Sequence, residues 1–315
     1  MSPDEFAIVN KWPAKYADRL QLYSLPTPNG VKVSIALEEL GVPYEAHLVS
    51  FENHDQRSPE FRSLNPNGKI PAIIDPNGPE GRPLALFESG AILIYLAEKA
   101  GRLMPLDAAA RFETLQWLMF QMAFVGPMFG QVGFFVKFAG KDFEDKRPRD
   151  RYVNEAKRLL GVLEGRLEGR RWIMGDDYTI ADIATFPWVR NLVGYYGAGA
   201  LVEFSQFINV QRALDAFLLR PAVQSGPPRG GLGCTSAGAQ QGRSRRDLAK
   251  MIQATASTKA IATSAVRASG VAIQSIALPK SGTRHTYWPT GELGFSFQNS
   301  LALLASPRVS TVSFA

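Results

Sequence analysis

The chain has 315 residues, 45% of them hydrophobic, which is enough to bury the cores of two domains of ordinary size. Its formal net charge is +6, but residues 226–315 hold ten Lys and Arg against Asp247 and Glu292, a local +8 that leaves −2 for residues 1–225. Because nucleic-acid affinity depends mainly on positive charge, residues 1–225 are not expected to bind nucleic acid.

The chain has one cysteine, Cys234, so it cannot form an internal disulfide bond or a metal cage of cysteines. This fits a reducing compartment, and we expect a cytoplasmic protein. The first residues, MSPDEFAIVNKWPAKY, carry acidic side chains where a signal peptide needs an apolar core, and no run of about 18 apolar residues follows. We expect neither secretion nor membrane spanning. His47 and His54 have no carboxylates at metal-ligand spacing, so we expect surface histidines and no metal site.

Strand and helix patterns alternate from residue 20 to residue 101. The predicted elements are strands at 20–25, 44–51, 69–75 and 84–87, and helices at 31–40 and 91–99. Gly41 is the predicted C-terminal cap of the first helix. This order, β-α-β and then β-β-α, predicts a small mixed sheet flanked by helices.

Strand patterns stop after residue 107, and apolar side chains recur at helical spacing, for example at 111–122 and 152–167. This predicts an all-helical second domain. Thr179 and Asp182 fit a capping box at a helix start. Residues 220–223 are the predicted last helix.

The composition changes after Gln224 to a Gly/Ser/Ala-rich, basic sequence with no helical or strand period. We expect a disordered basic tail, with a nucleic-acid or membrane tether as the alternative and an out-of-frame extension as the favoured origin. The predicted organisation is an N-terminal extension at 1–19, a mixed-sheet domain at 20–101, a helical domain at 107–224 and the tail at 225–315.

Three motifs lie where predicted strands or helices begin or end. TPNG (27–30) follows the first strand, NPNGKIPAI (65–73) leads into the third, and FESGAILIYLAE (87–98) is at a helix start. Together they resemble the glutathione transferase superfamily, from about residue 20 to 223. SLPTPNGVKV (24–33), GPMFGQ (126–131) and RYVNEAKRL (151–159) resemble its bacterial Nu class, a group similar to disulfide-bond oxidoreductases. The resemblance implies a thioredoxin-like N-terminal domain, an all-helical C-terminal domain and a homodimer.

The resemblance also implies glutathione as a bound co-substrate. Glu88 and Ser89 begin a helix, where Ser89 and free N–H groups can hold the γ-glutamyl carboxylate and Glu88 can accept from the ammonium. Ile70–Pro71 resembles the family's cis-proline turn, which leaves the Ile70 main chain free to pair with the cysteinyl part. On the sequence alone, Ser89 could be only a helix cap and Pro71 only a strand-edge residue.

Three further residues are assigned to the carboxylates of the peptide by the same resemblance. Gln56, just before PEF (59–61), is expected at the glycyl end, and Lys69 is expected near that carboxylate. Arg151 is expected to reach a peptide carboxylate, either in its own subunit or across a dimer interface. Each of the three is otherwise an ordinary surface residue.

Only the thiolate of glutathione is a good nucleophile, so some group must favour it over the thiol. The first turn offers Thr27 and Asn29, whose hydroxyl and amide can donate to the sulfur beside the helix N-terminus. Tyr23 is the rival, but its place inside a strand predicts sheet packing. Because residues 1–225 contain no cysteine, no enzyme–glutathione disulfide can form there.

The sequence therefore predicts an enzyme that reduces a small disulfide through bound glutathione, with two glutathiones or one glutathione disulfide in the site. Conjugation of glutathione to an electrophile is the first alternative. A glutathione-binding regulatory module without turnover is the second.

Overall fold

The computed structural model describes residues 6–224. The predicted tail, with Cys234, lies outside the described residues, as do residues 1–5. The first part of the chain contains η2 (Ala7–Asn10), β1 (Leu20–Ser24), α1 (Pro28–Leu40), β2 (Tyr44–Leu48), η3 (Asp55–Arg57), α2 (Pro59–Leu64), β3 (Ala72–Asp75), η4 (Pro79–Gly81), β4 (Leu84–Phe87) and α3 (Ser89–Ala100).

The strands form one mixed sheet in the order β2-β1-β3-β4, in which β1 is parallel to β2 and β3 is antiparallel to both β1 and β4. The predicted sheet is confirmed, and the largest differences are in where three elements begin or end. The second strand ends at Leu48 rather than 51, the third begins at Ala72 rather than 69, and the first helix begins at Pro28 rather than 31. Proline at the first helical position, where its missing N–H costs nothing, explains the earlier start.

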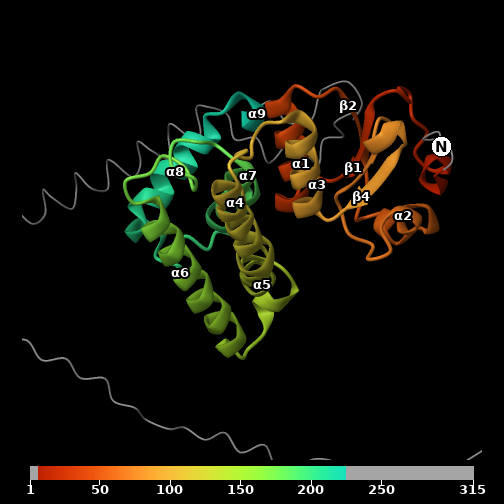
Figure 1. The fold of residues 1–315 in the computed structure, drawn as a ribbon. Helices are drawn as coiled ribbons and strands as arrows, with labels where there is room; N and C mark the ends of the chain where they lie inside the picture. Colours follow the sequence, from red (N-terminus) through yellow and green to blue (C-terminus); the bar gives the residue numbers. More distant parts are fainter. Residues whose placement is uncertain (1–5, 225–315) are drawn as a thin grey trace, which may run out of the picture. The chain divides into compact units, whose positions relative to one another are not determined.

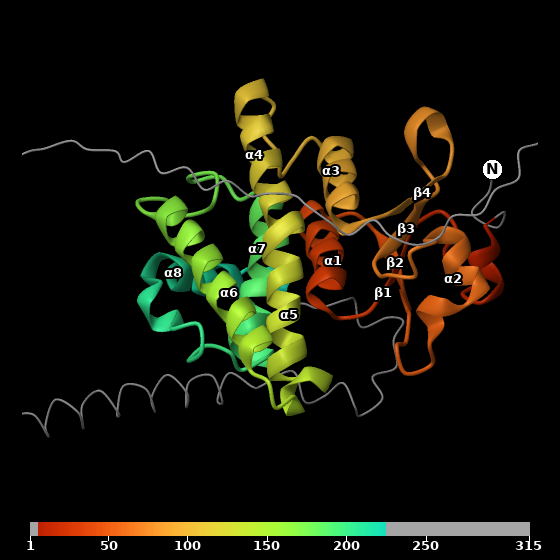
Figure 2. The same ribbon diagram turned by 90° about the horizontal axis from the view of Figure 1, so that it is seen from below.

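Helices cover both faces of this sheet. Helices α1 and α3 pack side by side on the face that looks toward the helical domain, and α2 and the N-terminal residues lie on the other (Figures 1 and 2). Helix α2 is not among the predicted elements, because six residues are too few to show a helical period. The sheet domain has a second core cluster, separate from the main core, made of Ile8, Tyr23, Val49, Phe61, Leu64, Ile70, Ala72 and Ile74. The residues before β1 contribute Ile8 to it, and Trp12 Nε1 donates to the Leu48 carbonyl at 3.0 Å.

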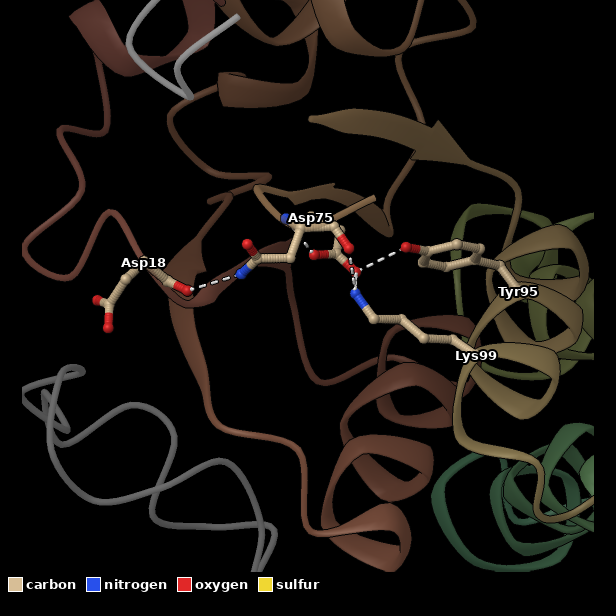
Figure 3. Close-up of polar contacts among 5 residues, drawn as sticks. Asp18, Asp75, Tyr95 and Lys99 are labelled. Atoms are coloured by element: carbon tan, nitrogen blue, oxygen red, sulfur yellow. Dashed lines mark hydrogen bonds and ion pairs between the residues drawn. The ribbon is translucent and has the colours of Figure 1, made fainter. Parts of the chain in front are cut away.

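A buried carboxylate ties the end of β3 to α3. The Asp75 side chain accepts from the Tyr95 hydroxyl at 2.7 Å and pairs with Lys99, both on α3 (Figure 3). It also accepts from the Asn77 main-chain N–H at 2.9 Å. These contacts hold the C-terminal half of α3 against the end of β3.

The second domain is all-helical, as predicted. It contains α4 (Ala108–Phe120), the π-helical turn η5 (Gln121–Val125), α5 (Gly126–Val136), η6 (Ala139–Asp142), α6 (Arg147–Leu167), α7 (Ile180–Arg190), the π-helical turn η7 (Asn191–Tyr195), η8 (Phe204–Gln206), α8 (Ile208–Leu218) and α9 (Pro221–Gln224). The capping box at the start of α7 is confirmed: the Asp182 carboxylate accepts from the Thr179 N–H at 2.9 Å.

The two domains are joined along α1, which packs on α7 and α9 as well as on α3. Arg220, just before α9, pairs with Glu39 near the end of α1 at 2.5 Å. One continuous helical stretch in the described part of the chain, 108–136, is long and apolar enough to cross a membrane by length and composition alone. It packs against α6 and α7, and 33% of its apolar window is buried inside the protein.

Candidate functional site

The register of the sheet brings three turns together at one end of the strands. Tyr23 near the end of β1 pairs with Ala72 at the start of β3, and Ala72 pairs with Phe87 at the end of β4. The TPNG turn (27–30) follows β1, the Ile70–Pro71 turn precedes β3, and the Glu88–Ser89 turn follows β4. These three predicted site segments therefore lie at the same end of neighbouring strands.

The TPNG turn caps α1. The Thr27 hydroxyl oxygen accepts from the Gly30 N–H at 3.2 Å, which leaves its own O–H proton free to donate. A Cβ at Gly30 would lie 1.9 Å from the Leu25 carbonyl oxygen, so only glycine allows this close approach. The turn thus presents a hydroxyl donor at the positive end of a 13-residue helix.

Asn29 is oriented by the second domain. Trp188 on α7 donates its indole N–H to the Asn29 side-chain oxygen at 3.0 Å. An indole nitrogen can only donate, so the carboxamide oxygen must face Trp188 and the two amide N–H groups must face away from it. The contact with Trp188 thereby turns the Asn29 amide N–H groups away from the indole, and their donation to the glutathione sulfur stays a prediction.

Glu88 and Ser89 form the start of α3 as expected. Glu88 has φ +71° and ψ 113°, a backbone conformation that is unfavourable for a side chain with a Cβ and is found mostly at functional sites. Its side chain is exposed, whereas Ser89 is 3% exposed. The first N–H groups of α3 have no partner within the helix, which suits an anion at this point.

Lys32 is a residue of this site that the sequence reasoning missed. It is fully buried on α1, and its ammonium donates to Ser89 Oγ at 3.3 Å and to Gln121 Oε1 at 2.7 Å. Burial lowers the pKa of Lys32 to about 7, against the opposing effect of Glu88. The sequence signal was weak: a lysine between two valines in a helix is usually read as a solvent-exposed residue.

The Ile70–Pro71 peptide bond is cis, as the resemblance implied. The β1–β3 pairing ends at Ala72, so the Ile70 main chain lies beyond the ladder and can meet an extended ligand. The neighbouring loop contacts Gln56: a Cβ at Gly68 would lie 3.0 Å from the Gln56 carbonyl oxygen. The Gln56 side-chain oxygen is buried with no hydrogen-bond partner among the described residues.

Lys69 and Arg151 are placed differently from each other. Lys69 is exposed beside Ile70, and its carbonyl accepts from the Asn65 amide at 2.6 Å. Arg151 is exposed in the first turns of α6, which packs on α5 and α8. Within this chain, none of the contacts described for residues 6–224 brings Arg151 to the three converging turns.

Tyr23 packs inside the sheet domain, as predicted. It is fully buried in the second core cluster, where its ring stacks on His47 at 4.7 Å between centroids. Burial raises the pKa of Tyr23 far above its ordinary value, so the phenol holds its proton. His47 is itself buried and lies 2.7 Å from Gln21 Oε1, so the expected surface position is wrong.

No group of three or more His, Cys, Asp and Glu side chains in the described part of the chain is arranged to hold a metal ion. The converging turns offer groups that can bind an extended, charged ligand. They combine hydroxyl and amide donors, free helix N–H groups, an extended main-chain segment and a carboxylate.

Comparison with known proteins gives the family. Residues 27–99 match the glutathione S-transferase N-terminal domain, and residues 148–216 match the glutathione S-transferase C-terminal domain. The disulfide-bond oxidoreductase YghU of Escherichia coli is 43% identical over 215 residues, which cover 66% of this chain and 73% of that protein. The disulfide-bond oxidoreductase YfcG of Escherichia coli is 45% identical over 171 residues, which cover 54% of this chain and 79% of that protein.

Solved structures agree. A glutathione transferase from Pseudomonas putida, with one glutathione disulfide bound per subunit, is 68% identical with a TM-score of 0.72, and the match covers 73% of this chain and 100% of that one. One from Burkholderia graminis, with two glutathione molecules bound per subunit, is 70% identical with a TM-score of 0.71, covering 72% of this chain and 96% of that one. The predicted resemblance is confirmed: the chain belongs to the glutathione S-transferase superfamily, among relatives that include disulfide-bond oxidoreductases.

Proposed function

We propose that this protein is a glutathione-dependent enzyme that reduces disulfides through the thiolate of bound glutathione, without an enzyme cysteine. The relatives named as disulfide-bond oxidoreductases support the reaction, and the neighbours with bound glutathione or glutathione disulfide support the ligand. The observation that carries the proposal is the Tyr23–Ala72–Phe87 row, beyond which three turns with peptide-binding chemistry converge.

Glutathione is proposed to lie across these turns. Its γ-glutamyl carboxylate binds Ser89 and the free N–H groups of α3, and its ammonium binds the exposed Glu88 carboxylate. Its cysteinyl part pairs with the Ile70 main chain beside Pro71. The sulfur then lies at the TPNG turn.

The thiolate is proposed to be stabilised by Thr27 and Asn29. The Thr27 hydroxyl is free to donate because its oxygen already accepts from Gly30, and the Asn29 amide is turned away from Trp188. Each hydrogen bond to a charged acceptor contributes about 1.5–3 kcal/mol, which favours the thiolate over the thiol. The N-terminal dipole of α1 adds to this effect.

The reaction then proceeds by two exchanges. The bound thiolate attacks one sulfur of the substrate disulfide, which breaks the S–S bond, forms a glutathione mixed disulfide and expels the other substrate sulfur as a thiolate that takes up a proton. A second glutathione thiolate attacks the mixed disulfide, so glutathione disulfide forms and the second substrate thiol leaves. Two glutathiones are oxidised and one disulfide is reduced.

Three more side chains are proposed to bind the carboxylates of the peptide. Gln56, with its unpartnered buried oxygen, and the exposed Lys69 are suited to the glycyl end. Arg151 is proposed to serve the site of a partner subunit in a homodimer, since its exposed position on α6 is not joined to the turns of its own chain. A cytoplasmic location supplies the reduced glutathione that the reaction consumes.

The test is a pair of assays on the full-length protein with glutathione, one with hydroxyethyl disulfide and one with a chlorodinitrobenzene electrophile. We expect turnover of the disulfide well above the uncatalysed rate. Disulfide turnover at background with efficient conjugation would instead identify a conjugating transferase. Binding of glutathione without turnover in either assay would identify a regulatory module.

A further inference from the structure

A buried lysine lies beside Ser89, at the proposed γ-glutamyl site. Lys32 is 0% exposed, which is rare for lysine. The three groups around its ammonium are Ser89 Oγ at 3.3 Å, Gln121 Oε1 at 2.7 Å and Met122 Sδ at 3.6 Å. All three are neutral, so none of them balances the charge of Lys32.

When Lys32 is protonated, its charge is costly in the absence of a counter-ion, because burial removes the water that would otherwise solvate it. The charged group that acts on Lys32 in the described part of the chain is Glu88, whose side chain is exposed at the cap of α3. Gln121 and Met122, which face Lys32 from the π-helical turn η5, do not titrate. A ligand carboxylate at the start of α3 would supply the missing counter-ion.

Ser89 links Lys32 to that position. Its oxygen accepts from the Lys32 ammonium, so its own hydroxyl proton must point elsewhere, and the partner within the chain is Met122 Sδ at 3.7 Å. Sulfur is a weak acceptor, and a carboxylate forms a much stronger charge-assisted hydrogen bond. The hydroxyl is therefore oriented by Lys32 and available to a stronger acceptor.

We infer that Lys32 is a positioning residue for the ligand carboxylate: it orients the Ser89 hydroxyl and supplies the buried counter-charge for an α-carboxylate bound at the start of α3. This inference rests on the proposed function, because it requires a γ-glutamyl ligand. Lys32 on α1 thereby joins the proposed glutathione site without touching the ligand.

The test pairs a protein change with a ligand change. Isothermal titration calorimetry on full-length wild type and Lys32→Met would use S-methylglutathione and an analogue with γ-aminobutyrate in place of γ-glutamate, which lacks the α-carboxylate. We expect Lys32→Met to weaken S-methylglutathione about tenfold or more and to change the affinity of the analogue less than about twofold. Leu37→Ala, a fully buried change on the same helix, should leave the ratio of the two affinities unchanged.

Equal losses for both ligands, or no loss for either, would overturn the inference while the proposed function stood. Failure of wild type to bind S-methylglutathione would overturn both. If Lys32→Met does not fold, proton uptake by wild type decides, measured as the dependence of binding heat on buffer ionisation enthalpy near pH 7.5.

The sign of the proton effect follows from the pKa of Lys32, about 7 in the free protein. Above that pH much of Lys32 is neutral, and a bound carboxylate favours the charged form, so binding must take up protons. S-methylglutathione has no thiol to contribute. No proton uptake near pH 7.5 would contradict the inference.

Discussion

The indole N–H of Trp188 donates to the side-chain oxygen of Asn29 at 3.0 Å, across 159 residues of sequence. It connects α7 of the helical domain to the TPNG turn of the sheet domain. Because it fixes which end of the carboxamide faces the proposed sulfur position, the helical domain takes part in the proposed thiolate site.

Trp188→Phe should therefore slow disulfide reduction by a factor of about ten, the equivalent of one lost hydrogen bond of about 1.4 kcal/mol. The measurement is kcat/KM for a small disulfide. If Trp188 acts through Asn29, the same change in an Asn29→Ala background should have no further effect. Trp117→Phe is the matched control, since its buried indole N–H has no partner among the described residues; fully additive effects of Trp188 and Asn29 would contradict this account.

Gly30→Ala tests the geometry of the TPNG turn. The new Cβ would lie 1.9 Å from the Leu25 carbonyl oxygen, so the main chain must move. We expect a loss of about 2 kcal/mol or more in unfolding free energy and loss of S-methylglutathione binding. Gly165→Ala in α6, with nothing within 4 Å of the new Cβ, should be neutral or stabilise the protein. Unchanged binding by Gly30→Ala would show that the turn does not form part of the site.

The local parts of this site could be predicted from the sequence. TPNG, Ile70–Pro71 and Glu88–Ser89 each carry their own turn or helix-start chemistry, and the strand order explains why they meet. The contacts of Lys32 and Trp188 could not be predicted, because each joins residues far apart in the chain and depends on how α1 packs. A lysine between valines gives no indication that Ser89 and Gln121 will enclose it.

Asp182→Ala tests what holds the helical domain together. The buried Asp182 carboxylate accepts from the main-chain N–H groups of Ile173 and Thr179, both at 2.9 Å. Loss of both bonds leaves two buried donors unpaired, and we expect unfolding free energy to fall by about 2–4 kcal/mol in urea denaturation. Asp177→Ala, at an exposed neighbouring position, should change it by less than about 0.5 kcal/mol. Equal effects would contradict a special role for the capping box.

Cys234→Ser tests whether an enzyme thiol takes part in the reaction. Cys234 is the only cysteine of the chain. Because the proposed nucleophile belongs to glutathione, we expect kcat and KM for the disulfide to stay within error of wild type. Alkylation of Cys234, with the excess reagent removed before glutathione is added, should likewise leave the activity intact. Loss of disulfide reduction in Cys234→Ser, with glutathione binding retained, would instead place the enzyme cysteine in the reaction.

The most direct test of the central claim is the pKa of the glutathione thiol in the complex, read from the ultraviolet absorbance of the thiolate as pH is varied. We expect wild type to lower this pKa below its value in free glutathione, and Asn29→Ala and Thr27→Val each to raise it by about one pH unit, the equivalent of one hydrogen bond to the thiolate. Thr27→Ser keeps the hydroxyl and should match wild type. A bound thiol that titrates like free glutathione, or variants that leave its pKa unchanged, would contradict the account.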